Sequence, residues 1–97
     1  MPTFAWTARF GADFRRLTSA EQAAFLAGVV QFVFDLRAGG EFRAGLRVKG
    51  VQGARGVFEM TWAANGRATF QYGPELTPGQ AHVIWRRVGT HDVFDRP

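Results

Sequence analysis

Residues 18–40 read TSAEQAAFLAGVVQFVFDLRAGG and carry both a start signal and a stop signal for one helix. A capping box pairs a Ser or Thr with a Glu or Gln three residues later, which satisfies two free backbone N–H groups at the helix start. Two such boxes overlap here: Thr18 with Glu21, and Ser19 with Gln22. Gly39-Gly40 then ends the helix, because glycine adopts the left-handed conformation common at helix ends. The sequence therefore predicts a helix that runs to Arg37 or Ala38.

This predicted helix bears two adjacent apolar rows. The row expected in the core comprises Phe25, Val29, Phe32, Val33 and Leu36. The second row, called the apolar row below, comprises Leu26, Val30 and Phe34. A helix that is apolar over so wide an arc is either enclosed by its own domain or covered by a partner. Because a chain of 97 residues has room for one modest core, the apolar row is predicted to bind a partner protein.

The residues before this helix predict a short strand and a short helix. From Thr3 to Ala8 the chain alternates, with Phe4, Trp6 and Ala8 on one side, which is typical of a strand with one buried face. Helical spacing follows at Phe10, Phe14 and Leu17.

The second half of the chain predicts three strands. Residues 57–62 alternate, Asn65-Gly66 is a strong hairpin signal, and residues 67–73 form the return strand. Residues 82–88 are apolar enough for a last strand inside a sheet. The predicted fold is α+β, in a single domain over residues 1–97. Its element order is β-α-α-β-β-β, with two helices packed on a small antiparallel-rich sheet.

Composition excludes several classes of protein. The chain has no cysteine, which rules out a disulfide scaffold, a thiolate zinc site and a cysteine nucleophile. No apolar run approaches the ~18 residues of a membrane span, and the first residues lack the charged-then-apolar pattern of a signal peptide. We therefore expect a soluble, cytoplasmic protein without a membrane partner.

The positive charge is concentrated in one stretch. Between positions 43 and 67 lie five basic residues and one acid, Glu59, whereas charges elsewhere cancel, so this stretch carries the whole net charge of +4. The five are Arg43, Arg47, Lys49, Arg55 and Arg67. Such concentration indicates an anionic partner, and the planar guanidinium of arginine suits phosphate oxygens. A solvated, Arg-rich surface remains the alternative at this point.

Other familiar sites are excluded or weak. The glycines spaced by three in residues 50–56 form no nucleotide-binding loop, because neither Gly-Lys-Ser/Thr nor a helix follows them. The only serine, Ser19, is a helix cap, so a Ser-His-Asp hydrolase is not expected. His82 and His91, the only histidines, lie nine residues apart with scattered carboxylates. We therefore expect no metal ion and no cofactor.

Six polar residues remain that folding does not require. They are Glu59 and Thr61 on a predicted strand, with Arg47, Lys49, Arg67 and His91 around them. Cleavage of RNA through its 2′-OH needs a proton acceptor, a proton donor and fixed positive charge at the scissile phosphate. Glutamate, histidine and the basic residues are the types that supply these three functions.

Four segments of the chain match a known pattern in their order and spacing. They are residues 48–53 (VKGVQG), 56–60 (GVFEM), 65–70 (NGRATF) and 87–94 (RVGTHDVF). On these segments the chain resembles the RelE/ParE superfamily of type II toxin–antitoxin toxins, and is nearer to RelE and YoeB than to ParE. The resemblance implies two N-terminal helices on an antiparallel-rich sheet, mRNA cleavage in the ribosomal A site by metal-free acid–base chemistry, and silencing by an antitoxin.

The resemblance also implies roles for individual residues. Arg67 matches the arginine that opens the family's third strand and contacts the phosphate. His91 falls where the family has an Arg or a His after the last strand, the His serving as general acid. Lys49 stands where YoeB-like members carry a glutamate base, and Glu59 where RelE-like members carry a lysine. Phe94 stands near the place of a frequent functional tyrosine.

The leading hypothesis is an endoribonuclease toxin that acts on mRNA at the ribosome and is silenced by a cognate antitoxin. Its predicted catalytic residues are Arg67, His91, Lys49 and Glu59. Further RNA contacts are predicted from Arg47, Arg55, Arg86 and Arg87. The antitoxin is expected to bind either the apolar row or the basic sheet face, which is the predicted strand face with Glu59 and Thr61 and the basic residues around it. Two alternatives stay open: a ParE-like protein that inhibits a topoisomerase without cutting nucleic acid, and a catalytically inactive interaction module of the same fold.

Overall fold

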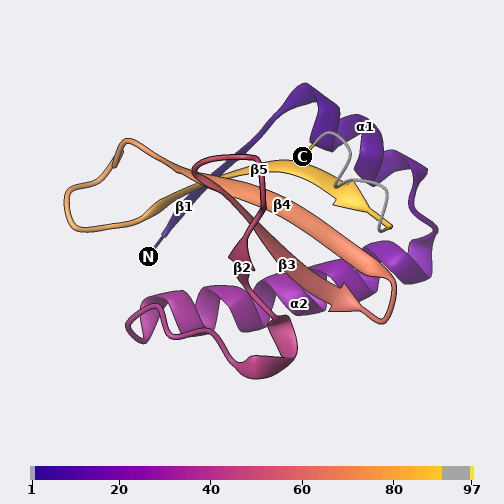
Figure 1. Cartoon of the computed structure of the whole chain (residues 1–97), viewed down its shortest axis with the longest axis horizontal. Coiled ribbons are helices and arrows are strands. Elements are labelled where there is room, and N and C mark those ends of the chain that lie inside the picture. Colours follow the sequence, from indigo (N-terminus) through magenta and orange to yellow (C-terminus); the bar gives the residue numbers. More distant parts are fainter. Residues whose placement is uncertain (1, 91–96) are drawn as a thin grey trace.

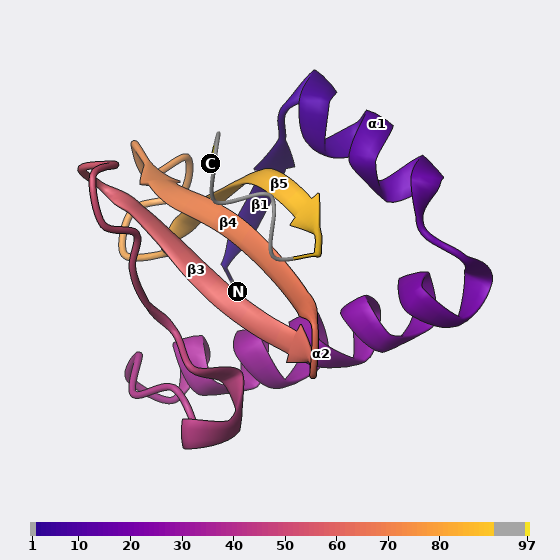
Figure 2. The same cartoon turned by 45° about the vertical axis from the view of Figure 1, so that its right-hand side comes forward.

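Two consecutive helices pack on one face of a five-stranded sheet (Figures 1 and 2). The structure is a computed structural model, which describes residues 2–90 and 97. Its elements are β1 (Thr3–Trp6), α1 (Ala8–Arg16), α2 (Ser19–Arg37), the 3₁₀ turn η1 (Ala44–Leu46), β2 (Lys49–Gly50), β3 (Val57–Ala63), β4 (Gly66–Gly73) and β5 (His82–Gly89). The strand order is β1-β5-β4-β3-β2, with β1 parallel to β5 and all other neighbours antiparallel. The predicted α+β class and helix-on-sheet architecture are confirmed.

The long helix begins and ends where the sequence predicts. Thr18 Oγ1 accepts a hydrogen bond from the N–H of Glu21 at 3.1 Å, and Glu21 Oε1 accepts one from the N–H of Thr18 at 2.8 Å. α2 ends at Arg37, and Gly39 and Gly40 follow with φ of 126° and 83°. Across the described part of the chain, neither helix has the length and hydropathy needed to cross a bilayer.

The core is aromatic and lies between the helices and the sheet. Phe32 of α2 is fully buried, with its ring centroid 5.0 Å from Phe70 of β4 and 5.3 Å from Trp85 of β5. Phe25 packs edge-on against Trp85 at 5.5 Å. Phe10 brings α1 into the same cluster, 5.7 Å from Phe25. Because both helices pack on this face, the opposite face of β3 and β4 carries the polar residues.

The first strand is shorter than the sequence predicts. β1 ends at Trp6 rather than Ala8, because Thr7 caps α1, with its Oγ1 accepting a hydrogen bond from the N–H of Phe10 at 3.1 Å. The prediction that Trp6 shares a buried face with Phe4 is wrong, since Trp6 is 66% exposed. The cap turns the chain before the indole reaches the core.

The sequence does not predict the two short elements between α2 and β3. η1 is one turn long, and its Leu46 is buried in the core. β2 pairs with β3 only at Phe58 and Glu59. β3 therefore has no strand partner on that side beyond Glu59.

The predicted β3–β4 hairpin is confirmed, with its turn one residue earlier than the Asn65-Gly66 signal suggests. The turn comprises residues 64–65, and Gly66 already pairs with Ala63. A Cβ on Gly66 would lie 2.6 Å from the ring of Trp62. The φ of Gly66 is not positive, so the backbone conformation does not demand glycine. Glycine is needed because the indole of Trp62 packs directly on the backbone at this position.

Candidate functional site

Polar side chains align on the sheet face opposite the helices. Lys49 of β2 lies directly across from Glu59 of β3, and one step along, Thr61 lies across from Arg67 of β4. Alternate residues of a strand point to the same face, and Met60, between Glu59 and Thr61, is buried in the core. The sheet register therefore brings together three of the four predicted catalytic residues: Lys49, Glu59 and Arg67.

Glu59 is a buried carboxylate that forms an ion pair with Lys49. It is 7% exposed, and its Oε1 lies 3.4 Å from Nζ of Lys49. The ammonium compensates the buried negative charge, while the Lys49 side chain stays 63% exposed. Within residues 2–90, no other ion pair or hydrogen bond is formed by this carboxylate. Its second oxygen, Oε2, thus has no ion pair or hydrogen bond with the described residues.

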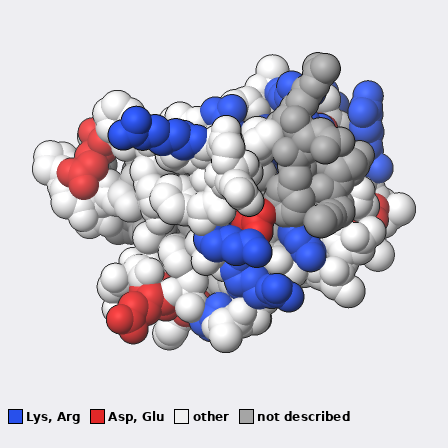
Figure 3. All heavy atoms as spheres, in the orientation of Figure 1, with Lys and Arg blue, Asp and Glu red and all other residues white. Residues whose placement is uncertain are grey.

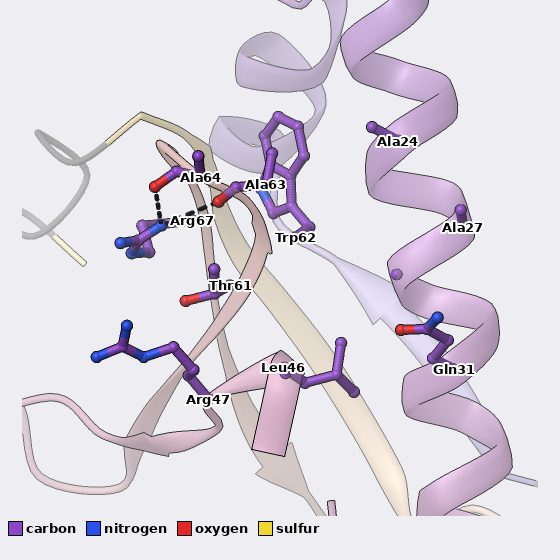
Figure 4. A pocket seen from close by; sticks show the side chains of 12 residues that line it. Ala24, Ala27, Gln31, Leu46, Arg47, Thr61, Trp62, Ala63, Ala64 and Arg67 are labelled. Carbon is purple, nitrogen blue, oxygen red and sulfur yellow. Dashed lines mark hydrogen bonds between the residues drawn. The ribbon is translucent and has the colours of Figure 1, made fainter. Parts of the chain in front are cut away.

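Arg47 and Arg67 border one hollow of about 580 Å³. Figure 4 shows Thr61 between them and both guanidinium groups directed to the same side. Arg47 follows η1 in the left-handed conformation, with φ 47°. Arg67 is braced through Nη1, which donates to the carbonyl oxygens of Ala63, Ala64 and Gly66 at 3.3, 3.4 and 2.9 Å. These bonds use Nη1 alone, so the other N–H groups of this guanidinium can bind an anion.

Positive charge gathers at this place on the surface. Figure 3 shows blue side chains around a red one over β2 and β3. We call the set Arg47, Lys49, Glu59, Thr61 and Arg67 the basic face. The described residues contain no group of three or more metal-ligating side chains.

Asp35, near the end of α2, fixes the loop that presents Arg47. Its Oδ2 accepts hydrogen bonds from the backbone N–H and the Nε of Arg43, and its Oδ1 accepts one from Nη2, each at 2.9 Å. η1 follows directly, with Leu46 2% exposed. The loop is thus held by an ion pair at its start and by a core residue next to Arg47. The hydrogen bonds from Arg43 lower the pKa of Asp35 from 3.8 to about 2, the side-chain bond being the main cause.

We expect Asp35→Asn to make the protein less stable at neutral pH, and the difference from wild type to vanish in acid. A carboxyl with a lowered folded-state pKa stabilises the fold above its unfolded pKa and loses that effect as the pH falls through the folded value. The window here lies between about 4 and about 2. Urea midpoints measured across this window test the expectation, with Glu41→Gln, an exposed acid, as the matched control. A gap between Asp35→Asn and wild type that does not change with pH would contradict it.

Two of the predicted RNA contacts, Arg86 and Arg87, line a different hollow from Arg47 and Arg67. Arg86 donates through Nε to the backbone oxygen of Pro97 at 3.0 Å and through Nη1 to Gln71. Arg87 donates through Nε to Oδ2 of the buried Asp13 at 2.6 Å. Both arginines line a second hollow, of about 450 Å³, which does not include Arg47 or Arg67. Their predicted contacts with RNA stay predictions.

The remaining predicted residues are placed as follows. Arg55 is exposed in the loop between β2 and β3, at the end of β3 opposite to Thr61. His91 and Phe94 lie outside the described residues. Sequence reasoning missed Thr69, which is fully buried across from Glu59 and donates through Oγ1 to the Pro97 oxygen at 3.0 Å. Its alternation with Arg67 and Gln71 along β4 is the signal that would have found it.

The apolar row is on the surface, as predicted. Leu26, Val30 and Phe34 are 52%, 69% and 67% exposed. An apolar hollow of about 440 Å³ between α1 and α2 adjoins the row at Leu26. Trp6 lines the same hollow and adds its exposed indole. The exposure of the apolar row agrees with the predicted contact with a partner, and the contact itself stays a prediction.

Comparison with known proteins finds similar structures but no similar sequences. No family model matches the chain, and no curated protein matches its sequence. YafQ from E. coli has a TM-score of 0.64 at 9% identity, over 96% of this chain and 97% of that one. The YoeB/ParE toxin from Agrobacterium tumefaciens has a TM-score of 0.65 at 11% identity, over 92% and 98%.

A third similar structure is an antitoxin–toxin complex. The RelB–RelE complex from Methanococcus jannaschii matches with a TM-score of 0.60 at 11% identity, over 95% of each chain. The likeness spans nearly the whole of every chain compared. The chain therefore shares the fold of these three structures, and this is the fold that the resemblance of its sequence segments implies.

Proposed function

We propose that this chain is the toxin of a type II toxin–antitoxin pair and that its basic face binds and cleaves mRNA at the ribosome. The observation that carries the proposal is the sheet register, which sets the ion pair of Lys49 and Glu59 one step along the strands from Thr61 and Arg67, with Arg47 lining the same hollow as Arg67. Folding does not require this grouping of basic residues around a carboxylate. The shared fold with the YoeB/ParE and RelE toxins supports the same reading.

The proposed reaction is cleavage of RNA by its own 2′-OH. Arg47, Lys49 and Arg67 hold the phosphate and stabilise the charge that develops on it. Glu59 accepts the proton of the 2′-OH, and the 2′-oxygen attacks phosphorus as the bond to the 5′-oxygen breaks. The leaving 5′-oxygen takes a proton, which leaves a 2′,3′-cyclic phosphate and a 5′-hydroxyl. His91, outside the described residues, is the proposed proton donor.

The partner proposed for the apolar row is the cognate antitoxin. Leu26, Val30 and Phe34 offer it a continuous apolar strip. The flanking helix α1 carries the exposed arginines Arg9, Arg15 and Arg16. A partner with an apolar face and acidic flanks fits this combination. The similarity to a chain of the RelB–RelE antitoxin–toxin complex supports such a partner.

RNA binding is expected to weaken steeply with salt. Each cation that neutralises a phosphate contributes roughly 0.7–1 to the slope of log K against log salt. Arg47→Ala and Arg67→Ala are each expected to reduce this slope by about that amount. Titration of a short single-stranded RNA between low and moderate salt measures it. Arg16→Ala, an exposed arginine on α1, is the matched control, and a flat response in the wild type would contradict phosphate binding.

The test of the function itself compares two targets. The purified protein is added to a translation extract, where mRNA is followed for cleavage, and to a DNA supercoiling reaction with a topoisomerase. The proposal expects cleaved mRNA and arrested translation, with supercoiling unaffected. Inhibition of supercoiling without RNA cleavage would instead select the topoisomerase-inhibitor alternative.

A further inference from the structure

The hollow beside the basic face runs along the free edge of β3. In an antiparallel sheet the N–H and C=O of one residue point to the same side, and this side alternates along the strand. The C=O of Val57 accepts a hydrogen bond from the N–H of Val51, on the β2 side, at 2.8 Å. The backbone groups of Thr61, four residues later, point to that side too. Because β2 pairs with β3 no farther than Glu59, the N–H and C=O of Thr61 face the hollow instead of a strand.

The wall opposite this edge is formed by small residues of α2. Ala24, Ala27 and Gly28 carry no side chain larger than a methyl group, and Leu46 of η1 adds apolar surface (Figure 4). The exposed Gln31 contributes an amide that can donate and accept. The hollow therefore has apolar walls, hydrogen-bonding groups along its edges and two arginines at its border.

We propose that this hollow receives one unstacked nucleobase of an RNA strand whose adjoining phosphates lie on Arg47 and Arg67; the inference rests on the proposed function. A nucleobase is flat, apolar on its faces and rich in hydrogen-bond donors and acceptors at its edges. Single-stranded RNA is recognised chiefly through bases that are turned out of the stack and bonded at those edges. The backbone of Thr61 and the amide of Gln31 are the groups that read the base edge, and Ala27 faces the base.

An added peptide strand fits the same hollow less well. The free edge of β3 spans only residues 61–63, between the end of β2 pairing and the hairpin turn. Strand addition gains its affinity from a run of main-chain hydrogen bonds, and so short an edge supplies few. The arginines at the border also place phosphate-binding groups next to the hollow.

The test compares a short single-stranded RNA with an abasic ribose-phosphate strand of the same length, both bound to the full chain at one salt concentration. Ala27→Leu fills the hollow and is expected to weaken binding of the RNA about tenfold, the effect of losing one base contact. Binding of the abasic strand is expected to stay unchanged. Gln31→Ala keeps the hollow open and is expected to weaken the RNA severalfold, with the size of the loss depending on which base is present.

The matched control is Ala23→Leu, the same change at an exposed position of α2 outside the hollow, which is expected to bind both strands as wild type does. Equal losses for the RNA and the abasic strand, or no loss for either variant, would overturn the base site while leaving phosphate binding intact. A wild-type protein that binds neither strand would overturn the proposed RNA function as well. Ala27-dependent binding of an acidic peptide, with RNA binding insensitive to Ala27→Leu, would assign the hollow to a peptide.

Discussion

Glu59→Gln is expected to lower the rate of RNA cleavage by about 10²- to 10⁴-fold, the usual contribution of one positioned general base. The Gln amide cannot take a proton from a 2′-OH, whereas the carboxylate of Glu59 lies on the basic face with Nζ of Lys49 3.4 Å away as its charged neighbour. Gln has the same shape and keeps a polar side-chain oxygen beside Nζ of Lys49, so the fold is expected to persist. Single-turnover cleavage of a defined RNA measures the rate, and thermal unfolding checks the fold.

The control for this variant is Glu41→Gln, which removes the same charge from an exposed position outside the sheet. Both variants are expected to bind RNA at least as tightly as the wild type, because each loses one negative charge. Only Glu59→Gln is expected to lose cleavage. Cleavage at the wild-type rate by Glu59→Gln would remove this residue from the chemistry and favour the two alternatives that bind without cutting.

The features that the sequence predicts well are those whose signals are local. The capping box at Thr18 and Glu21, and the glycines after Arg37, lie within a few residues of the structure they specify. The β3–β4 hairpin joins strands that are neighbours in the chain. The exposure of the apolar row also follows from spacing along one helix. These elements form the helix-on-sheet frame, which is why the fold class could be inferred without coordinates.

The features that the sequence does not predict depend on contacts between distant residues. β2 is two residues long and exists only through its pairing with β3, so no periodicity marks it. That pairing sets Lys49 against Glu59, which the spacing of the two along the chain does not show. Trp6 fits a strand pattern but is excluded from the core by the cap that Thr7 forms. The sequence therefore predicts which types of residue form the candidate site. Their arrangement depends on the sheet register, which the sequence does not show.

Arg87 is a predicted site residue whose role the sequence alone does not reveal. A count of charges does not distinguish an arginine that stabilises the fold from one that binds a ligand. Nε and Nη2 of Arg87 donate hydrogen bonds to Oδ2 and Oδ1 of Asp13 at 2.6 and 3.3 Å, and Oδ2 also accepts a hydrogen bond from the N–H of Val88 at 3.3 Å.

Asp13→Ala is expected to lower the free energy of unfolding by about 3 kcal/mol. This is the lower end of the range for a broken buried pair, because the Arg87 side chain is 17% exposed. Thermal unfolding should show a midpoint lower by roughly 12 °C or more.

The double variant Asp13→Leu with Arg87→Met separates the cost of breaking this pair from any role of Arg87 with RNA. Replacing both charges of a buried pair by apolar groups is often neutral, so the double variant should unfold within about 1 kcal/mol of wild type while Arg87→Met alone is destabilised. A double variant as unstable as Asp13→Ala would contradict the account of the ion pair.

The same folded double variant lacks Arg87, so the salt dependence of its RNA binding directly tests the sequence-based prediction that Arg87 contacts RNA. If the slope of log K against log salt falls by about 1, Arg87 contacts a phosphate of the RNA. If the slope is unchanged, the role of Arg87 is to join α1 to β5.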